Sequence, residues 1–169
     1  CSIGSRPIDL QLNALKKMGA KIKVKNVYII ASAKRGLKGC LIKFPKISVG
    51  ATQNILIASC FSKGKTKLRK CASGPEVEDL INFLKKTGAK INFSGARGLN
   101  IEGVQRLKST SHKVIFDRIE TGTYIIASAL TKGRLKIKNI IPEIISNEIS
   151  ILKKMGVVID KGKNYIVVT

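Results

Sequence analysis

The stretch ALKKMGAKI at residues 14–22 returns as FLKKTGAKI at residues 83–91 and as ILKKMGVVI at residues 151–159. The glycines of the three copies are 69 and then 68 residues apart. A second marker agrees, because IASCFSKG, ending at Gly64, matches IASALTKG, ending at Gly133, again 69 residues later. Two independent markers at one offset indicate a repeated structural unit.

The copy at residues 73–90, SGPEVEDLINFLKKTGAK, predicts a helix with recognisable ends. Ser73 and Glu76 have the spacing of a capping box, and Pro75 suits the first helical turn. Apolar residues at i, i+3, i+4 and i+7 predict one buried stripe, made of Val77, Leu80, Ile81 and Leu84. The two lysines before Gly88 favour a helix C-terminus, and Gly88 suits a left-handed cap.

Short β-like runs and a second helix complete the unit. The runs are KINF at 90–93, LNIEG at 99–103 after a turn at 94–98, KVIFD at 113–117 and RLKIKN at 134–139, with a helix at 119–133. Strands that alternate with helices in this way predict an α/β fold. The helix expected at 51–61 has few charges, so we expect the helices to pack inward against one another with the sheets outside.

The composition is that of a folded, strongly basic chain. Apolar residues make up 44%, which excludes a disordered chain, and the net charge is +22. The 25 lysines and 7 arginines are scattered, aromatic residues are only 5%, and isoleucine also numbers 25. Joint lysine and isoleucine excess is typical of AT-rich coding sequence, so a solvated basic surface is favoured. A basic nucleic-acid-binding module stays an alternative.

The sequence indicates neither a membrane protein nor a metal protein. It contains no apolar run of about 18 residues and no secretory leader, so we expect a cytoplasmic chain without a membrane partner. Cys1, Cys40, Cys60 and Cys71 form no CxxC pair, and His112 is the only histidine. We therefore expect no metal, no cofactor and no disulfide framework, with the last three cysteines acting as small buried hydrophobes.

Two stretches have the features of an anion-binding site. In KFPKISVGATQNILIAS, Ser48 can cap a helix that begins near Gly50, which leaves backbone N–H groups at Val49–Ala51 for an anion. Lys46 adds a point charge upstream, and Gly50 lets a diphosphate approach the backbone. On this stretch alone, an ordinary capped helix with a solvated lysine is favoured over an anion site.

The second stretch is SIGSRPIDL, at the start of the chain. Gly4 allows a mobile loop, and Arg6 offers a bidentate fork for phosphate or carboxylate. Asp9 either accepts hydrogen bonds from a ligand or caps the helix expected at 10–18. Cys1 lies five residues before Arg6, where a nearby cation favours a reactive thiol.

Together these residues resemble the UDP-N-acetylglucosamine enolpyruvyl transferase (1-carboxyvinyltransferase) family. The matching stretches, in the family's order and spacing along all 169 residues, are CSIGSRPIDL, RGLKG at 35–39, KISVGAT, PEVEDLINFL, IEGV and DRIETGT. The opening cysteine loop is the most specific, because the related shikimate-pathway transferase does not carry it.

The resemblance implies a fold and a place within it. The family's enzyme has two domains, each an inside-out α/β barrel of three repeated βαβαββ-type units, with the active site between them. This chain is then a central fragment with a little over two of the six units. Residues 1–115 are expected to be part of the first domain, and residues 116–169 the start of the second.

The resemblance also implies a reaction, the first committed step of peptidoglycan synthesis. The enolpyruvyl group of phosphoenolpyruvate passes to the 3-hydroxyl of UDP-N-acetylglucosamine, and phosphate is released. Cys1 falls on the catalytic general acid, which forms a covalent adduct and is alkylated by fosfomycin. Matching substrate contacts are Arg6, Pro7, Ile8, Asp9, Leu10, Lys46, Ile47, Ser48, Val49 and Gly50. The expected partners are the two substrates and the missing parts of the same chain, not nucleic acid.

Several positions depart from the family pattern. Gln11 replaces a usual histidine, and Phe116 replaces the proline before DRIETGT. The family pattern also differs at Lys70, Ser73 and Gly74, shortly before Pro75. Asp117 and Glu120 lie near a helix N-terminus, where a structural role is favoured over a catalytic one. Other catalytic residues of the family lie outside this chain, so we do not expect it to turn over alone. A degenerate, non-catalytic remnant is a further alternative.

Overall fold

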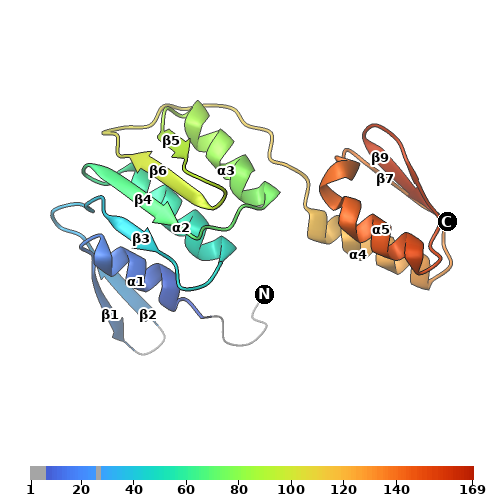
Figure 1. Cartoon of the computed structure of the whole chain (residues 1–169), viewed down its shortest axis with the longest axis horizontal. Coiled ribbons are helices and arrows are strands. Elements are labelled where there is room, and N and C mark those ends of the chain that lie inside the picture. The colour runs from blue at the N-terminus through green and yellow to red at the C-terminus, as the bar shows by residue number, and fades with distance from the viewer. Residues whose placement is uncertain (1–6, 26–27) are drawn as a thin grey trace. The chain divides into compact units, whose positions relative to one another are not determined.

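The computed structural model describes residues 7–25 and 28–169 (Figure 1). The chain divides into two compact units, Cys1–Lys113 and Val114–Thr169. Each unit is described by itself below. Their assignment to the first and second domains of a transferase stays a prediction.

The first unit contains three helices and six strands among its described residues. In chain order these are α1 (Asp9–Lys17), β1 (Lys21–Lys25), β2 (Tyr28–Ser32), β3 (Leu41–Lys43), α2 (Val49–Cys60), β4 (Lys65–Arg69), α3 (Pro75–Lys86), β5 (Lys90–Phe93) and β6 (Gly98–Glu102). Strands β1 and β2 form an antiparallel hairpin. The other four strands form a sheet in the order β3-β4-β6-β5, parallel at β3-β4 and antiparallel elsewhere.

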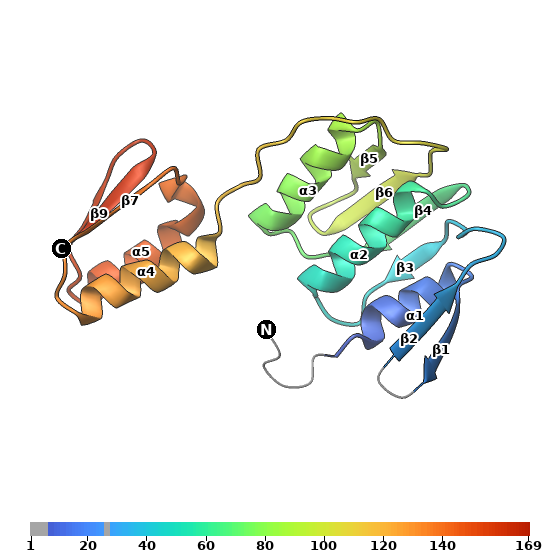
Figure 2. The ribbon, with the colours of Figure 1, turned by 180° about the vertical axis from the view of Figure 1, so that it is seen from behind.

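The three helices of this unit pack against one another, with α2 in contact with both α1 and α3. Figures 1 and 2 show them side by side, with α2 and α3 against one face of the four-stranded sheet. In both views the three helices begin at the same end of the unit. Their buried faces and the inner face of the sheet share one hydrophobic core. The predicted α/β class and the mutual packing of the helices are confirmed.

Helix α3 has the predicted buried stripe but a different start. Val77, Ile81 and Leu84 are buried, and Gly88 adopts the left-handed conformation with φ +98. The capping box predicted at Ser73 is wrong, because Gly74 is the N-cap and no side chain caps the helix there. The extended backbone of Gly74, with ψ 164, leads directly into Pro75, so the helix begins one residue after the position that Ser73 needs.

The second unit repeats the order of the first from α2 onward, with a 3-10 helix added before its second α-helix. Its elements are α4 (Arg118–Leu130), β7 (Leu135–Lys138), the 3-10 helix η1 (Pro142–Ile145), α5 (Ser146–Lys154), β8 (Ile159–Lys161) and β9 (Tyr165–Val168). The antiparallel sheet order β7-β9-β8 matches β4-β6-β5 of the first unit. Residues from both helices and from β8 and β9 form its separate core. The repeat seen in the sequence is therefore a repeat of structure.

The strand predicted at KVIFD, residues 113–117, is wrong. This segment has no regular secondary structure, and Val114 is 73% exposed. Strand β3, at the equivalent place in the first unit, pairs with β4, whereas β7 is paired with β9 alone among the described strands. A β-like sequence without a paired neighbour makes no ladder hydrogen bonds, so alternating apolar residues do not suffice for a strand.

The described cysteines are only partly as predicted. Cys60 and Cys71 are buried, and burial raises the pKa of each thiol to about 11. Cys40 is only half-buried. Burial raises the pKa of its thiol as well, because desolvation outweighs the nearby positive charge of Lys17. Cys60 and Cys71 are therefore small apolar core residues that stay protonated at neutral pH.

Candidate functional site

The N-terminus of α2 has the geometry that the sequence predicts for an anion-binding helix start. Ser48 is the N-cap, with extended backbone, and its Oγ accepts the Ala51 N–H at 3.2 Å. The first turn of α2 contains no acidic residue. The N–H groups of Val49 and Gly50 therefore face outward at the positive end of the helix dipole, without a carboxylate of this turn. A Cβ added to Gly50 would meet nothing within 4 Å, so its backbone is open to a ligand.

The backbone beside this helix start is held by a buried hydroxyl. Thr52 donates its hydroxyl proton to the carbonyl of Ser48 at 2.7 Å, and Thr52 Oγ1 accepts the N–H of Ala72 at 3.0 Å. Thr52 is fully buried. The start of α2 is thereby tied to the segment that leads into α3, which gives an anion a rigid set of donors.

Lysines increase the positive potential at the same place. Lys46 and Ile47 are exposed immediately before the N-cap. The ammonium group of Lys70 donates to the carbonyl oxygen of Pro45, the residue before Lys46. Lys70 has a left-handed backbone, with φ 59. In the sequence Lys70 is only a departure from a family pattern, because nothing there shows this fold-back toward Pro45.

A groove lies along α1, beside the segment that leads to Lys46. It has a volume of about 470 Å³ and is lined by Asp9, Leu10 and the segment 42–45, among others. Asp9 and Leu10 line this groove together with Pro45, whereas the predicted contacts at residues 46–50 do not. Pro7, Ile8 and Asp9 are exposed, whereas the side chain of Leu10 belongs to the core.

Asp9 does not cap the helix that follows it. The N-cap of α1 is Ile8, and no side chain makes a cap hydrogen bond there. Asp9 is the first residue of the helix, where the macrodipole stabilises a carboxylate. The capping alternative is therefore wrong, and the alternative in which Asp9 accepts hydrogen bonds from a ligand stays a prediction.

Two of the predicted site residues, Cys1 and Arg6, lie outside the described residues.

In the second unit, Asp117 caps α4, because its Oδ1 accepts the N–H of Ile119 at 2.7 Å and the N–H of Glu120 at 3.2 Å. The structural role favoured for Asp117 is confirmed.

Metal sites and membrane spans are both missing from residues 7–25 and 28–169. In that part of the chain, His, Cys, Asp and Glu side chains nowhere gather in threes as a metal site would need. Over the same residues, none of the helices has both the length and the apolar character needed to cross a membrane.

Comparisons with known proteins give consistent results along the chain. The family model described as EPSP synthase (3-phosphoshikimate 1-carboxyvinyltransferase) matches residues 1–169. The UDP-N-acetylglucosamine 1-carboxyvinyltransferase of Pelagibacter ubique (strain HTCC1062) is 53% identical over 168 residues, which are 99% of this chain and 40% of the relative. The protein of the same name from Endomicrobium trichonymphae is 49% identical over 98% of this chain and 40% of its own length.

The fold is also similar to a solved structure. The enolpyruvyl transferase NikO from Streptomyces tendae has a TM-score of 0.81 at 23% identity, covering 98% of this chain and 42% of that protein. At this identity the likeness concerns the fold alone. The chain thus spans about 40% of the length of the curated relatives that it matches.

Proposed function

The chain belongs to the EPSP synthase (3-phosphoshikimate 1-carboxyvinyltransferase) family, and from this we propose that its protein transfers an enolpyruvyl group to UDP-N-acetylglucosamine. Phosphoenolpyruvate is the donor, the 3-hydroxyl of the sugar is the acceptor, and phosphate leaves. The observation that carries the proposal is the name shared by relatives that are 53% and 49% identical over nearly the whole chain. The product is a precursor of peptidoglycan, which we expect to be made in the cytoplasm.

The choice of acceptor rests on the relatives rather than on the fold. The family description names a phosphoshikimate transferase, and the structural likeness to NikO concerns the fold alone. The relatives at about half identity are named for the nucleotide sugar. The opening CSIGSRPIDL loop, which the shikimate-pathway enzyme lacks, favours the same acceptor.

Each part of the candidate site has a role in this reaction. The start of α2, with Lys46 and the backbone N–H groups of Val49 and Gly50, is suited to the diphosphate of the nucleotide. The groove at Asp9 and Leu10 offers a carboxylate acceptor and an apolar wall for the nucleoside. Cys1, carried on the loop with Arg6, serves as the general acid toward the enolpyruvyl methylene.

Only part of the proposed catalytic machinery is present in this chain. The relatives are about two and a half times longer, since the chain covers 40% of their length. The remaining catalytic groups are therefore expected from the rest of the enzyme. The two compact units are proposed to belong to its first and second domains, with the change of domain near residue 115.

Two measurements on the full-length protein test the proposal. We expect Lys46→Ala to raise the calorimetric Kd for UDP-N-acetylglucosamine about tenfold, whereas Lys34→Ala, an exposed lysine in the turn after β2, leaves it unchanged. We also expect Cys1→Ser to abolish transfer, and fosfomycin to add its mass to the wild-type protein but not to the variant. An unchanged Kd removes Lys46 from the site, and wild-type protein without a mass shift contradicts the assignment of Cys1.

A further inference from the structure

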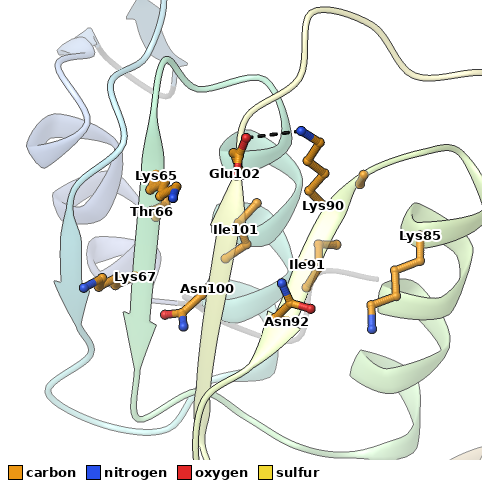
Figure 3. A pocket seen from close by; sticks show the side chains of 11 residues that line it. Lys65, Thr66, Lys67, Lys85, Lys90, Ile91, Asn92, Asn100, Ile101 and Glu102 are labelled. Carbon is orange, nitrogen blue, oxygen red and sulfur yellow. Dashed lines mark hydrogen bonds and ion pairs between the residues drawn. The ribbon is translucent and has the colours of Figure 1, made fainter.

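The four-stranded sheet of the first unit has a hollow on the face turned away from α2 (Figure 3). It has a volume of about 700 Å³, within the range of small-molecule sites. Strands β4, β6 and β5 form its floor, and Lys85 from the last turn of α3 reaches its edge. The candidate nucleotide site lies elsewhere, at the N-terminal ends of α1 and α2.

Strand register arranges the polar side chains of the hollow in two rows. Because side chains alternate along a strand, Lys65 and Lys67 point outward while Thr66 between them is buried. Glu102 is paired with Lys65 on one side and with Lys90 on the other. Two residues earlier on β6, Asn100 is paired with Lys67 and Asn92, which form the second row. Figure 3 shows both rows on the same face.

The two rows differ in the placement of their charges. In the first row, Nζ of Lys90 lies 3.2 Å from Oε1 of Glu102, which partly neutralises that end of the hollow. Glu102 is the one acid among the described residues that line it. The second row contains Lys67 and two carboxamides, without an acid. The two rows have the same net charge, but Lys67 in the second row has no acid beside it among the described residues that line the hollow, so an anion is favoured there.

A second cation reaches the second row from outside the sheet. Lys85 lines the hollow at the outer edge of β5. Its ammonium group lies 5.4 Å from the centre of the ring of Phe93, the residue after Asn92, whose side chain alternates to the other side of the strand. Figure 3 shows Lys85 on the far side of Asn92 from Asn100. The row thus runs from Lys67 through two amide side chains to Lys85, with a positive charge at each end.

Asn100 adds a requirement beyond negative charge. Its Oδ1 is buried, and none of the described residues donates a hydrogen bond to it. A buried acceptor without a donor is costly, typically about 1–3 kcal/mol. A bare anion cannot supply that donor, whereas a hydroxyl group can. An occupant with acceptor oxygens for the lysines and a hydroxyl for Asn100 suits the row, with the Asn100 amide turning its buried Oδ1 toward the hollow to meet that hydroxyl.

We propose that this sheet face binds a phosphorylated sugar, with the phosphate between Lys67 and Lys85 and a sugar hydroxyl donating to Asn100. Asn92 and the amide of Asn100 contribute further donors to the phosphate or the ring. The site is separate from the proposed nucleotide site. It would remain if the acceptor of the transfer reaction were a different molecule.

The test is a ³¹P NMR titration of the full-length protein with ribose 5-phosphate, saturated with UDP-N-acetylglucosamine so that the transfer site is occupied. We expect binding to persist under these conditions, and Lys67→Gln with Lys85→Gln to raise the Kd at least tenfold. The matched control, Lys23→Gln with Lys34→Gln, removes two exposed lysines of the same unit and should change the Kd less than twofold.

Further titrations distinguish the chemistry of the ligand. Inorganic phosphate should bind at least fivefold more weakly than ribose 5-phosphate, and Asn100→Ala should remove that difference. Three results would overturn the proposal. They are an equal loss of affinity in the control pair, displacement of ribose 5-phosphate by UDP-N-acetylglucosamine, and equal affinities for inorganic phosphate and ribose 5-phosphate. Repeating the titration on Lys46→Ala separates the two sites, because that variant impairs the transfer site only. If the double variant does not fold by circular dichroism, Lys85→Gln alone carries the test, since Lys85 is exposed.

Discussion

The imidazole Nε2 of His112 lies 3.0 Å from Oδ1 of Asp79, on a helix 33 residues earlier in the chain. The His112 side chain is 11% exposed, and its ring centre lies 5.5 Å from that of Phe83 on the same helix. The first unit ends one residue later, at Lys113. The pair therefore fastens the end of the first unit to α3.

Removing this attachment should destabilise the first unit. We expect His112→Ala to lower the free energy of unfolding by about 1–2 kcal/mol in urea titrations, because a half-buried hydrogen bond and a ring contact are lost. Thr110→Ala, two residues away and exposed, serves as the control. A double-mutant cycle with Asp79→Ala should give a coupling energy of about 1 kcal/mol. Additive effects of the two substitutions would show that the pair contributes nothing.

The two candidate N-cap serines should behave differently. Ser48 caps α2 through the Ala51 N–H, whereas Ser73 lies before the Gly74 cap of α3. We expect Ser48→Ala to lower the free energy of unfolding by about 1 kcal/mol and Ser73→Ala to change it by less than about 0.5 kcal/mol. Chemical denaturation of both variants is the measurement. Equal losses would mean that α3 begins where the sequence pattern predicts.

Two glycines give a steric test with opposite outcomes. A Cβ on Gly103 would overlap the carbonyl oxygen of Ser62, while a Cβ on Gly50 meets nothing within 4 Å. Gly103→Ala should therefore destabilise the fold by more than about 2 kcal/mol. Gly50→Ala should leave thermal stability intact and weaken binding of UDP-N-acetylglucosamine, because its methyl group stands where the diphosphate approaches. Tight binding by a stable Gly50→Ala protein would contradict the proposed contact.

The buried thiols predict a loss of stability at alkaline pH. Because the pKa of Cys60 and of Cys71 is about 11 in the fold and near 9 when unfolded, the unfolded chain releases these protons first. Their contribution is fully present below pH 9 and is lost as pH rises toward 11, on the order of 2 kcal/mol per thiol. Unfolding free energies of wild type and Cys60→Ala/Cys71→Ala, compared across this range, should show the steeper decline in wild type. Parallel declines would contradict the prediction.

The repeat was readable from the sequence because its signals are local. A stripe at helical spacing, two lysines and a glycine in left-handed conformation define the end of α3, and Gly19 and Gly156 end α1 and α5 in the same conformation. The cap at Ser48 was equally local, since the residue type and the helix that follows determine it. The C-terminal ends of these helices and the start of α2 therefore needed no knowledge of the tertiary structure.

Two of the features that the sequence did not show depend on partners distant in the sequence, and the third depends on the conformation of a neighbouring glycine. The strand predicted at residues 113–117 has apolar alternation but no neighbouring strand to pair with. Lys70 reaches Pro45 only because its backbone takes a left-handed conformation at the end of β4, which its residue type does not favour. Ser73 loses its capping role to a glycine that is extended before Pro75. Sequence spacing alone contains none of this information.

The β1-β2 hairpin has a consequence for handling the protein. Among the described strands β2 pairs with β1 only, whereas its counterparts β6 and β9 each pair on two sides. Val24, Tyr28 and Ile30 are more than half exposed on this hairpin, beside an edge of unpaired backbone groups. Purified in isolation, this chain should tend to form edge-to-edge fibrils as its concentration rises. At low ionic strength, repulsion between the alternating lysines of β1 would delay that association. Added salt should therefore accelerate it, so storage buffers of low ionic strength are preferable.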